Sequence, residues 1–207
     1  MAEVMNATAP DALADQVLER LFTGARTANR FVRRPVPDRL LRELYDLVKF
    51  GPTASNLCPA RFTFVRGRVA KERLLRALEP GNVERTREAP VTVIVGWDED
   101  FHLRAPDLFP GRPDLVARHA GDERKDIRRE VAFRNSSLQG AYMIIAARAL
   151  GLDCGPMSGF DPEVIERDFF PDRKTRVNFL CNLGFADRAA QFPRLPRLPF
   201  EDACALV

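Results

Sequence analysis

The sequence predicts one domain of mixed α and β structure, in which helices cover both faces of a central sheet. Val91 to Trp97 is an unbroken, mostly β-branched run without polar alternation, which is typical of a strand buried on both faces. Leu138 to Leu150 is apolar on nearly every face of the helix that it predicts, so no face is left for water. This run is shorter than the roughly 20 apolar residues that cross a bilayer, and protein must therefore bury it.

The composition is that of a globular protein. The chain has 207 residues, of which 45% are hydrophobic and 29% charged, and its formal net charge is +3. This charge is too small to favour nucleic-acid binding. The first residues lack a basic stretch followed by an apolar one, so we expect no secretory signal and a cytoplasmic protein. The four cysteines form no C-x-x-C pair, which predicts reduced, mostly buried thiols and neither a metal site nor disulfides.

The N-terminal part predicts two helices. Asp11 can cap the first, whose apolar residues repeat with helical spacing until Gly24. The second spans Pro37 to Phe50 and ends at Gly51-Pro52. Its predicted apolar face consists of Leu40, Leu41, Leu44, Leu47 and Val48.

Further elements flank the buried strand. We expect a strand at Arg61 to Arg66, a helix at Val69 to Leu78 and a turn at Pro80-Gly81. Asp161 and Pro162 are good cap and first-turn residues for a helix that reaches Phe170. Thr175 to Phe185 predicts a second core strand.

Two loops are expected to be functional. After the apolar helix, Gly151 favours a left-handed cap, and Gly155, Pro156 and Gly159 predict a sharp turn whose backbone can lie close to a ligand. Asp98 to Asp126 shows no clear periodicity and predicts a lid or an insertion. Its two histidines, His102 and His119, are expected to be solvated surface residues.

Several common motifs are absent from the sequence. No G-x-G-x-x-G follows a strand, and there is neither a Walker A loop nor a G-x-S-x-G elbow. An enzyme with this sequence is therefore expected to rely on a cofactor for its reactivity.

Three short segments carry side chains that suit a planar, anionic cofactor. Arg26 to Phe31 offers a guanidinium, a hydroxyl and an amide, and Arg194 to Arg197 is a second candidate for binding phosphate. Pro52 to Asn56 follows a helix end with small polar residues that can meet the heteroatoms of a ring. Each segment taken singly is better explained as an ordinary turn.

Taken together and in order, these stretches resemble a known family. The matching residues are ARTANRF at 25–31, LYDLVKFGPTASNLCPARFTFV at 44–65, APVTVIVGWD at 89–98, FRNSSLQGAY and ARALGLDCGPMSGFD between 133 and 161, and RLPRLPFEDA at 194–203. On these residues the sequence resembles the FMN-dependent nitroreductase family over nearly the whole chain. Within that family it looks most like the malonic semialdehyde reductase branch of pyrimidine catabolism.

The resemblance implies an α+β, three-layer sandwich with a mixed central sheet flanked by helices. It also implies an intertwined homodimer with FMN at the subunit interface and NADH or NADPH as electron donor. Pro52 to Asn56 would come from the partner subunit. The implied cofactor-binding residues are Arg26, Thr27, Asn29, Pro52, Thr53, Ala54, Ser55, Asn56, Asn135, Gly155, Pro156, Met157, Ser158 and Arg197.

The chain departs from the family pattern at three places. Asn29 stands where many members carry a second Arg, and Asn135 where many carry Asp. Ala141-Tyr142 replaces a common Gln-Asn pair. The first two departures favour the semialdehyde branch.

The expected reaction is a ping-pong reduction, in which NAD(P)H reduces FMN and a small carbonyl acceptor then takes the hydride. The acceptor that the branch implies is malonic semialdehyde, reduced to 3-hydroxypropionate. Arg61, Arg104 and Arg134 could each bind its carboxylate, and the sequence does not choose among them. The alternatives are a broad nitroaromatic or quinone reductase and a flavin-binding protein without turnover.

Overall fold

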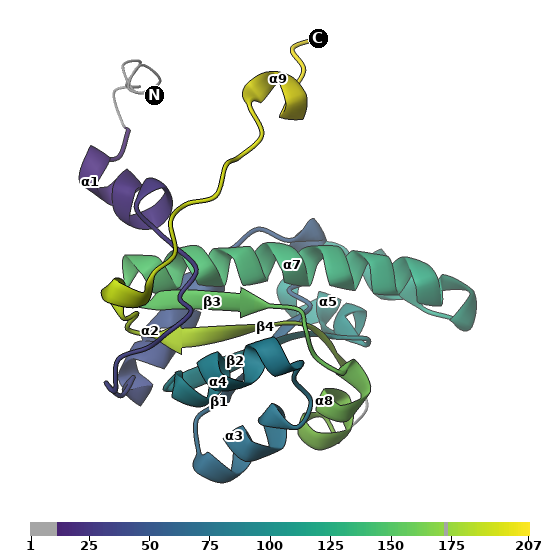
Figure 1. Ribbon diagram of the computed structural model, residues 1–207. Helices are drawn as coiled ribbons and strands as arrows, with labels where there is room; N and C mark the ends of the chain where they lie inside the picture. Colours follow the sequence, from purple (N-terminus) through teal and green to yellow (C-terminus); the bar gives the residue numbers. More distant parts are fainter. Residues whose placement is uncertain (1–11, 172–173) are drawn as a thin grey trace.

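The computed structural model describes residues 12–171 and 174–207 and places a four-stranded sheet at the centre (Figure 1). The strands are β1 Ala60–Val65, β2 Val91–Asp98, β3 Asp153–Met157 and β4 Thr175–Gly184, in the order β1-β2-β4-β3. All three pairings between these strands are antiparallel, so the part of the sheet that is described is antiparallel where a mixed sheet was expected.

The strand β2 is buried on both faces, as predicted. Val91 to Trp97 are all buried. Val93 and Val95 pack in a core with the helices α2 Asp38–Val48 and α7 Lys125–Ala149, whereas Ile94 packs on the other face. The helices α3 Arg68–Leu75 and α8 Pro162–Phe169 cover that second face (Figure 1). The expected coverage of both sheet faces is thereby confirmed.

The long helix α7 ends as the sequence predicts but is buried on one side only. Gly151 follows it with φ of +83°, in the left-handed region that glycine tolerates. Phe133, Leu138 and Tyr142 remain between 46% and 50% exposed. The complete burial expected for this helix is therefore not reached within one chain.

Two turns predicted from Pro-Gly or Gly-Pro pairs are regular elements. Pro80 starts the helix α4 Pro80–Glu88, because the first turn of a helix does not need the N–H that proline lacks. Gly155 and Pro156 belong to β3, which lies at an edge of the sheet, where a missing N–H is tolerated. On α2, Leu47 is 44% exposed, so it does not belong to the buried face on which it was predicted.

The cap of α8 is confirmed. Asp161 Oδ1 accepts from the backbone N–H of Glu163 at 2.9 Å and of Val164 at 3.3 Å. Among the cysteines, Cys154 and Cys181 are buried, whereas Cys204 is exposed, so the thiols are less buried than expected. No helix in the described residues is long and apolar enough to cross a membrane.

The first helix and the tail leave the body on the same side of α7 (Figure 1). The helix α1 Asp15–Leu18 continues as a π-helical turn, Glu19–Thr23, and ends at Gly24 as predicted. The predicted cap, Asp11, lies outside the described residues. The tail contains a 3-10 turn at Arg188–Ala190 and the helix α9 Phe200–Ala203.

The segment 98–126 is helical and packed. It contains 3-10 turns and short helices at Phe101–Arg104, Ala105–Leu108 (α5), Asp114–His119 (α6) and Asp122–Arg124. His102 and His119 are 6% and 8% exposed, which corrects the expectation of solvated rings. Both rings pack edge-on against the buried Phe101, and burial lowers the pKa of His102.

Candidate functional site

A cavity of about 680 Å³ lies between the segment after α1 and the tail. It is lined by four of the predicted site residues, which come from distant parts of the sequence: Arg26, Thr27, Asn29 and Arg197. Arg148 of α7 and Arg194 of the tail also line it. The sequence contained a signal for both, because Arg148 interrupts an apolar helix and Arg194 opens the predicted phosphate-binding motif of the tail.

The four arginines of this cavity use backbone carbonyls as partners. Arg26 Nη1 donates to Ala25 O at 3.0 Å, and Arg194 Nη2 donates to the same oxygen at 2.8 Å. Arg148 Nη1 donates to the carbonyl of residue 21 at 2.8 Å, and Arg197 Nη1 to that of residue 195 at 2.9 Å. Within residues 12–171 and 174–207, none of the four has a carboxylate partner.

The cavity is therefore a site of concentrated positive charge. Loss of solvent, followed by the positive charge of the other three guanidinium groups, lowers the pKa of Arg194. A guanidinium carries five N–H donors, so each of these side chains keeps donors for a ligand after its bonds to the backbone. Like charges held together without a counter-ion are a binding site for an anion, and paired N–H groups suit phosphate.

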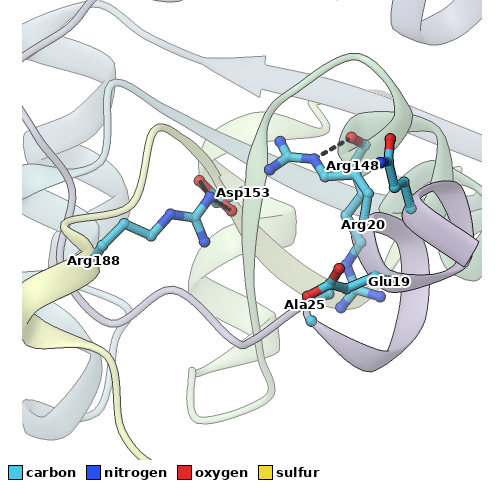
Figure 2. Close-up of a pocket in the computed structure, with 8 residues that line it drawn as sticks. Glu19, Arg20, Ala25, Arg148, Asp153 and Arg188 are labelled. Atoms are coloured by element: carbon cyan, nitrogen blue, oxygen red, sulfur yellow. Dashed lines mark hydrogen bonds and ion pairs between the residues drawn. The ribbon is translucent and has the colours of Figure 1, made fainter.

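A neighbouring cavity of about 420 Å³ shares Ala25 and Arg148 but differs in charge balance (Figure 2). Here Arg188 Nη2 lies 3.0 and 3.1 Å from the two carboxylate oxygens of Asp153. Glu19 supplies a second acidic group beside Arg20. The two acidic side chains offset part of the charge of the three arginines that line it, so this cavity is the weaker candidate for an anion.

The strand β3 touches the segment that carries Arg26. The N–H of Ala28 donates to Cys154 O at 2.8 Å. A Cβ on Gly155 would lie 2.6 Å from Ala28 O, so only glycine allows this approach. Met157 is buried in the core, and Ser158 just beyond the strand is exposed. Of the predicted stretch from 155 to 158, mainly the backbone and Ser158 are available to a ligand.

The loop 52–58 lies before β1, at the opposite edge of the sheet, and includes a 3-10 turn at Ala54–Asn56. Ser55, Asn56 and Cys58 all have positive φ, of 50°, 54° and 41°. Such conformations cost non-glycine residues free energy and persist where the surroundings impose them. Thr53 Oγ1 accepts from the N–H of Cys58 at 3.2 Å and closes the loop on itself.

Two amides of α7 hold this loop in place. Asn135 Oδ1 accepts from the N–H of Ala54 at 2.7 Å, while its Nδ2 donates to Val131 O at 2.8 Å. One turn further along, Gln139 Oε1 accepts from the N–H of Ala60 at 2.9 Å. Asn135 is buried and both ends of its amide are used, so its observed contact is with the loop, not with a cavity.

The predicted site residues thus form two groups. The structure brings Arg26, Thr27, Asn29 and Arg197 together and places Gly155 next to them. It does not bring Pro52 to Asn56 there, because β1 and β3 are the two edges of a four-stranded sheet. Three strand spacings of about 4.8 Å each separate these edges.

Comparison with known proteins agrees with this architecture. A profile of the nitroreductase family matches residues 22–185. A protein of Cupriavidus pinatubonensis, provisionally named NADH dehydrogenase/NAD(P)H nitroreductase, is 53% identical over 192 residues, which cover 93% of this chain and 98% of the relative. A protein of the same name from Rhodopseudomonas palustris is 50% identical over 203 residues, or 98% of this chain and 100% of the relative.

Solved structures with little sequence identity share the fold. A provisionally named nitroreductase of Bacillus subtilis gives a TM-score of 0.83 at 24% identity, covering 92% of this chain and 98% of the other. Another, from Exiguobacterium sibiricum and solved in complex with FMN, gives 0.81 at 17% identity, covering 95% and 99%. With the family profile matching most of its length, the chain belongs to the nitroreductase family.

Proposed function

We propose that this protein is an FMN-dependent oxidoreductase that takes electrons from NAD(P)H. The observation that carries the proposal is the cluster of Arg26, Arg148, Arg194 and Arg197 around one cavity without a carboxylate. The phosphate of FMN carries close to two negative charges and three acceptor oxygens at neutral pH, and this donor set fits it. A relative named as an NAD(P)H nitroreductase and a similar structure solved in complex with FMN support the same function.

In this proposal the protein binds and orients FMN and its reaction partners, and FMN supplies the reactivity. When bound, FMN supplies a centre that can accept a hydride from NAD(P)H and donate it to an electron-poor acceptor. Arg26, Thr27, Asn29 and Arg197 would hold the phosphate. The backbone of Gly155 and Pro156, next to that group, would lie along the ring.

A second copy of the chain is needed to bring Pro52 to Asn56 to the ring, because one chain holds this loop at the other edge of its sheet. The exposed side of α7, with Leu138 and Tyr142, offers an apolar surface for that copy. Phe192 and Leu195 of the tail, 70% and 74% exposed, offer another. We therefore propose a homodimer in which both subunits contribute to each FMN site, and in which the segment 98–126 covers the ring.

The proposed acceptor is a small carbonyl compound, malonic semialdehyde, which would be reduced to 3-hydroxypropionate. Asn29 and Asn135, which stand where many members of the family carry Arg and Asp, support this choice. The second candidate is a broad nitroaromatic or quinone reductase, which the names of the relatives favour.

A visible spectrum of the purified protein tests the proposal. We expect a flavin spectrum that bleaches when NADH or NADPH is added without oxygen and returns when malonic semialdehyde follows. A colourless protein that stays colourless with added FMN would overturn the flavin assignment. A flavin that NAD(P)H cannot reduce would indicate binding without turnover, and a higher kcat/KM for a nitroaromatic than for the semialdehyde would favour the second candidate.

A further inference from the structure

A third cavity, of about 250 Å³, lies between the loop 52–58 and the segment 98–126. Ala54 and Ser55 line it on the loop side, and Arg118 and His119 line it from α6. Much of the remaining wall is apolar: Leu57, Leu115, Ile127 and Val131. The volume lies just below the range of about 300–1,000 Å³ that is usual for ligand pockets, so the cavity suits a small molecule.

Arg118 is the permanently charged group of this cavity, and within the described ranges it makes no hydrogen bond or ion pair. Asp114, one turn earlier on α6, is already bound by Arg112 through two hydrogen bonds of 2.8 and 2.7 Å. The five donors of the Arg118 guanidinium therefore remain for a ligand. Because Arg118 is exposed, an anion reaches its guanidinium directly from solvent.

The three arginines that the sequence offered for this role are engaged elsewhere. Arg61 Nη2 lies 2.6 Å from Asp98 Oδ2, and its Nη1 donates to the carbonyl of residue 60 at 2.9 Å. Arg134 pairs with Glu130 on the outer side of α7. Arg104, 3.8 Å from Asp107, does not line the cavity.

We propose that Arg118 binds the carboxylate of a small aldehyde acid and selects it over neutral acceptors. The inference rests on the proposed function, in which the loop 52–56 borders the flavin ring and thus brings this cavity next to the reacting centre. Ser55 lines the cavity from the loop side, so an aldehyde acid whose carboxylate meets Arg118 on α6 extends its carbonyl along the loop that would border the ring. Arg118 is then the residue that determines substrate specificity.

The test compares Arg118→Gln with Arg124→Gln in the FMN-loaded protein. Arg124 is exposed in the same segment and does not line the cavity, so it controls for the loss of one charge. For Arg118→Gln we expect kcat/KM for malonic semialdehyde to fall about tenfold to a hundredfold, as for the loss of a charge-assisted hydrogen bond. In the same variant, kcat/KM for propanal and for a nitroaromatic should stay within about twofold of the wild-type values. The rate of flavin reduction by NADH should also stay within about twofold. Arg124→Gln should match the wild type throughout.

Equilibrium binding gives a readout without turnover. Calorimetry with 3-hydroxypropionate and with the neutral 1,3-propanediol should show that Arg118→Gln weakens only the acid. Equal weakening of both, or of neither, would overturn the assignment of Arg118. A wild-type flavin that NADH does not reduce would instead refute the proposed function, and the binding experiment would still decide whether Arg118 recognises the carboxylate.

Discussion

Lys71 and the arginine cluster both hold positive charge without a carboxylate partner in the described chain, and they differ in how their donors are used. Lys71 on α3 is 7% exposed, and its Nζ donates to Thr86 O, Ala89 O and Thr92 Oγ1 at 3.1, 2.9 and 3.0 Å. An ammonium group has three donors, so none remains. The arginines around the 680 Å³ cavity line open space and keep donors in excess of their bonds to the backbone.

Lys71 is therefore a structural cation, whereas the arginines of the cluster are available to bind a ligand. Lys71 joins α3, α4 and β2 through groups of its own chain, and a ligand could add nothing there. The arginine cluster gains its best partners only when an anion enters. Changes to Lys71 should therefore alter stability, and changes to the cluster should alter affinity.

The largest effect is expected from Arg26→Ala combined with Arg197→Ala. Losing a charge-assisted hydrogen bond costs about 1.5–3 kcal/mol, so Arg26→Ala alone should weaken FMN binding about tenfold to a hundredfold and the pair about a hundredfold to ten-thousandfold. The free energy of unfolding should change by less than about 1 kcal/mol, because both side chains contact only nearby carbonyls. FMN titration followed by fluorescence measures the affinity.

The matched control for this pair is Arg39→Ala with Arg68→Ala, two exposed arginines far from the cavity in sequence. They should leave FMN affinity unchanged. Equal losses in both double variants would mean that overall charge, not the cluster, attracts the cofactor.

The next effect is the pH dependence contributed by Lys71. Burial lowers its pKa to about 8, whereas an unfolded chain has about 10.4. Between these values the unfolded state binds more protons, so stability rises as the pH increases from about 8 to 10.4, by at most about 3 kcal/mol. The difference in unfolding free energy between wild type and Lys71→Met should follow this rise, while FMN affinity stays constant. Urea titrations at several pH values measure this difference. A difference that does not change with pH would contradict the assigned role of the Lys71 pKa.

Local patterns in the sequence predicted the fold wherever neighbours along the chain decide the structure. The buried run of β2, the cap at Asp161 and the left-handed Gly151 are of this kind. β3 was missed because an edge position, which only the assembled sheet reveals, makes a strand containing Gly155 and Pro156 acceptable. The burial of the two histidines likewise depends on tertiary packing against Phe101.

The site was predictable in composition but not in arrangement. The side chains of Arg26 and Arg197 suggested phosphate binding, but only the family resemblance placed them in one site, because nothing in spacing alone brings the tail to the N-terminal segment. Arg194 and the carbonyl of Phe22, which it contacts, are 172 residues apart in sequence. The contact of Asn135 with Ala54 spans 81 residues and could not be predicted from the sequence either. Side chains that act through such contacts are recognised only when the partner is seen.

The smallest effect is expected at Asn135, whose buried amide is neutral, unlike Lys71 and the arginine cluster. Asn135→Leu leaves the N–H of Ala54 without an acceptor and should lower the free energy of unfolding by about 1–3 kcal/mol. FMN affinity should fall less than tenfold, because the arginine cluster is intact. Asn135→Asp is the informative companion, since its carboxylate keeps the acceptor for Ala54 but has no donor for Val131 O until it is protonated. Burial without a neighbouring cation raises the pKa of the new carboxyl, so the folded state binds the extra proton. Relative to wild type, this variant should be most stable at low pH and lose stability as the pH rises from about 4 through the raised pKa. Chemical denaturation across pH measures this, and a stability difference that does not change with pH would show that water reaches residue 135.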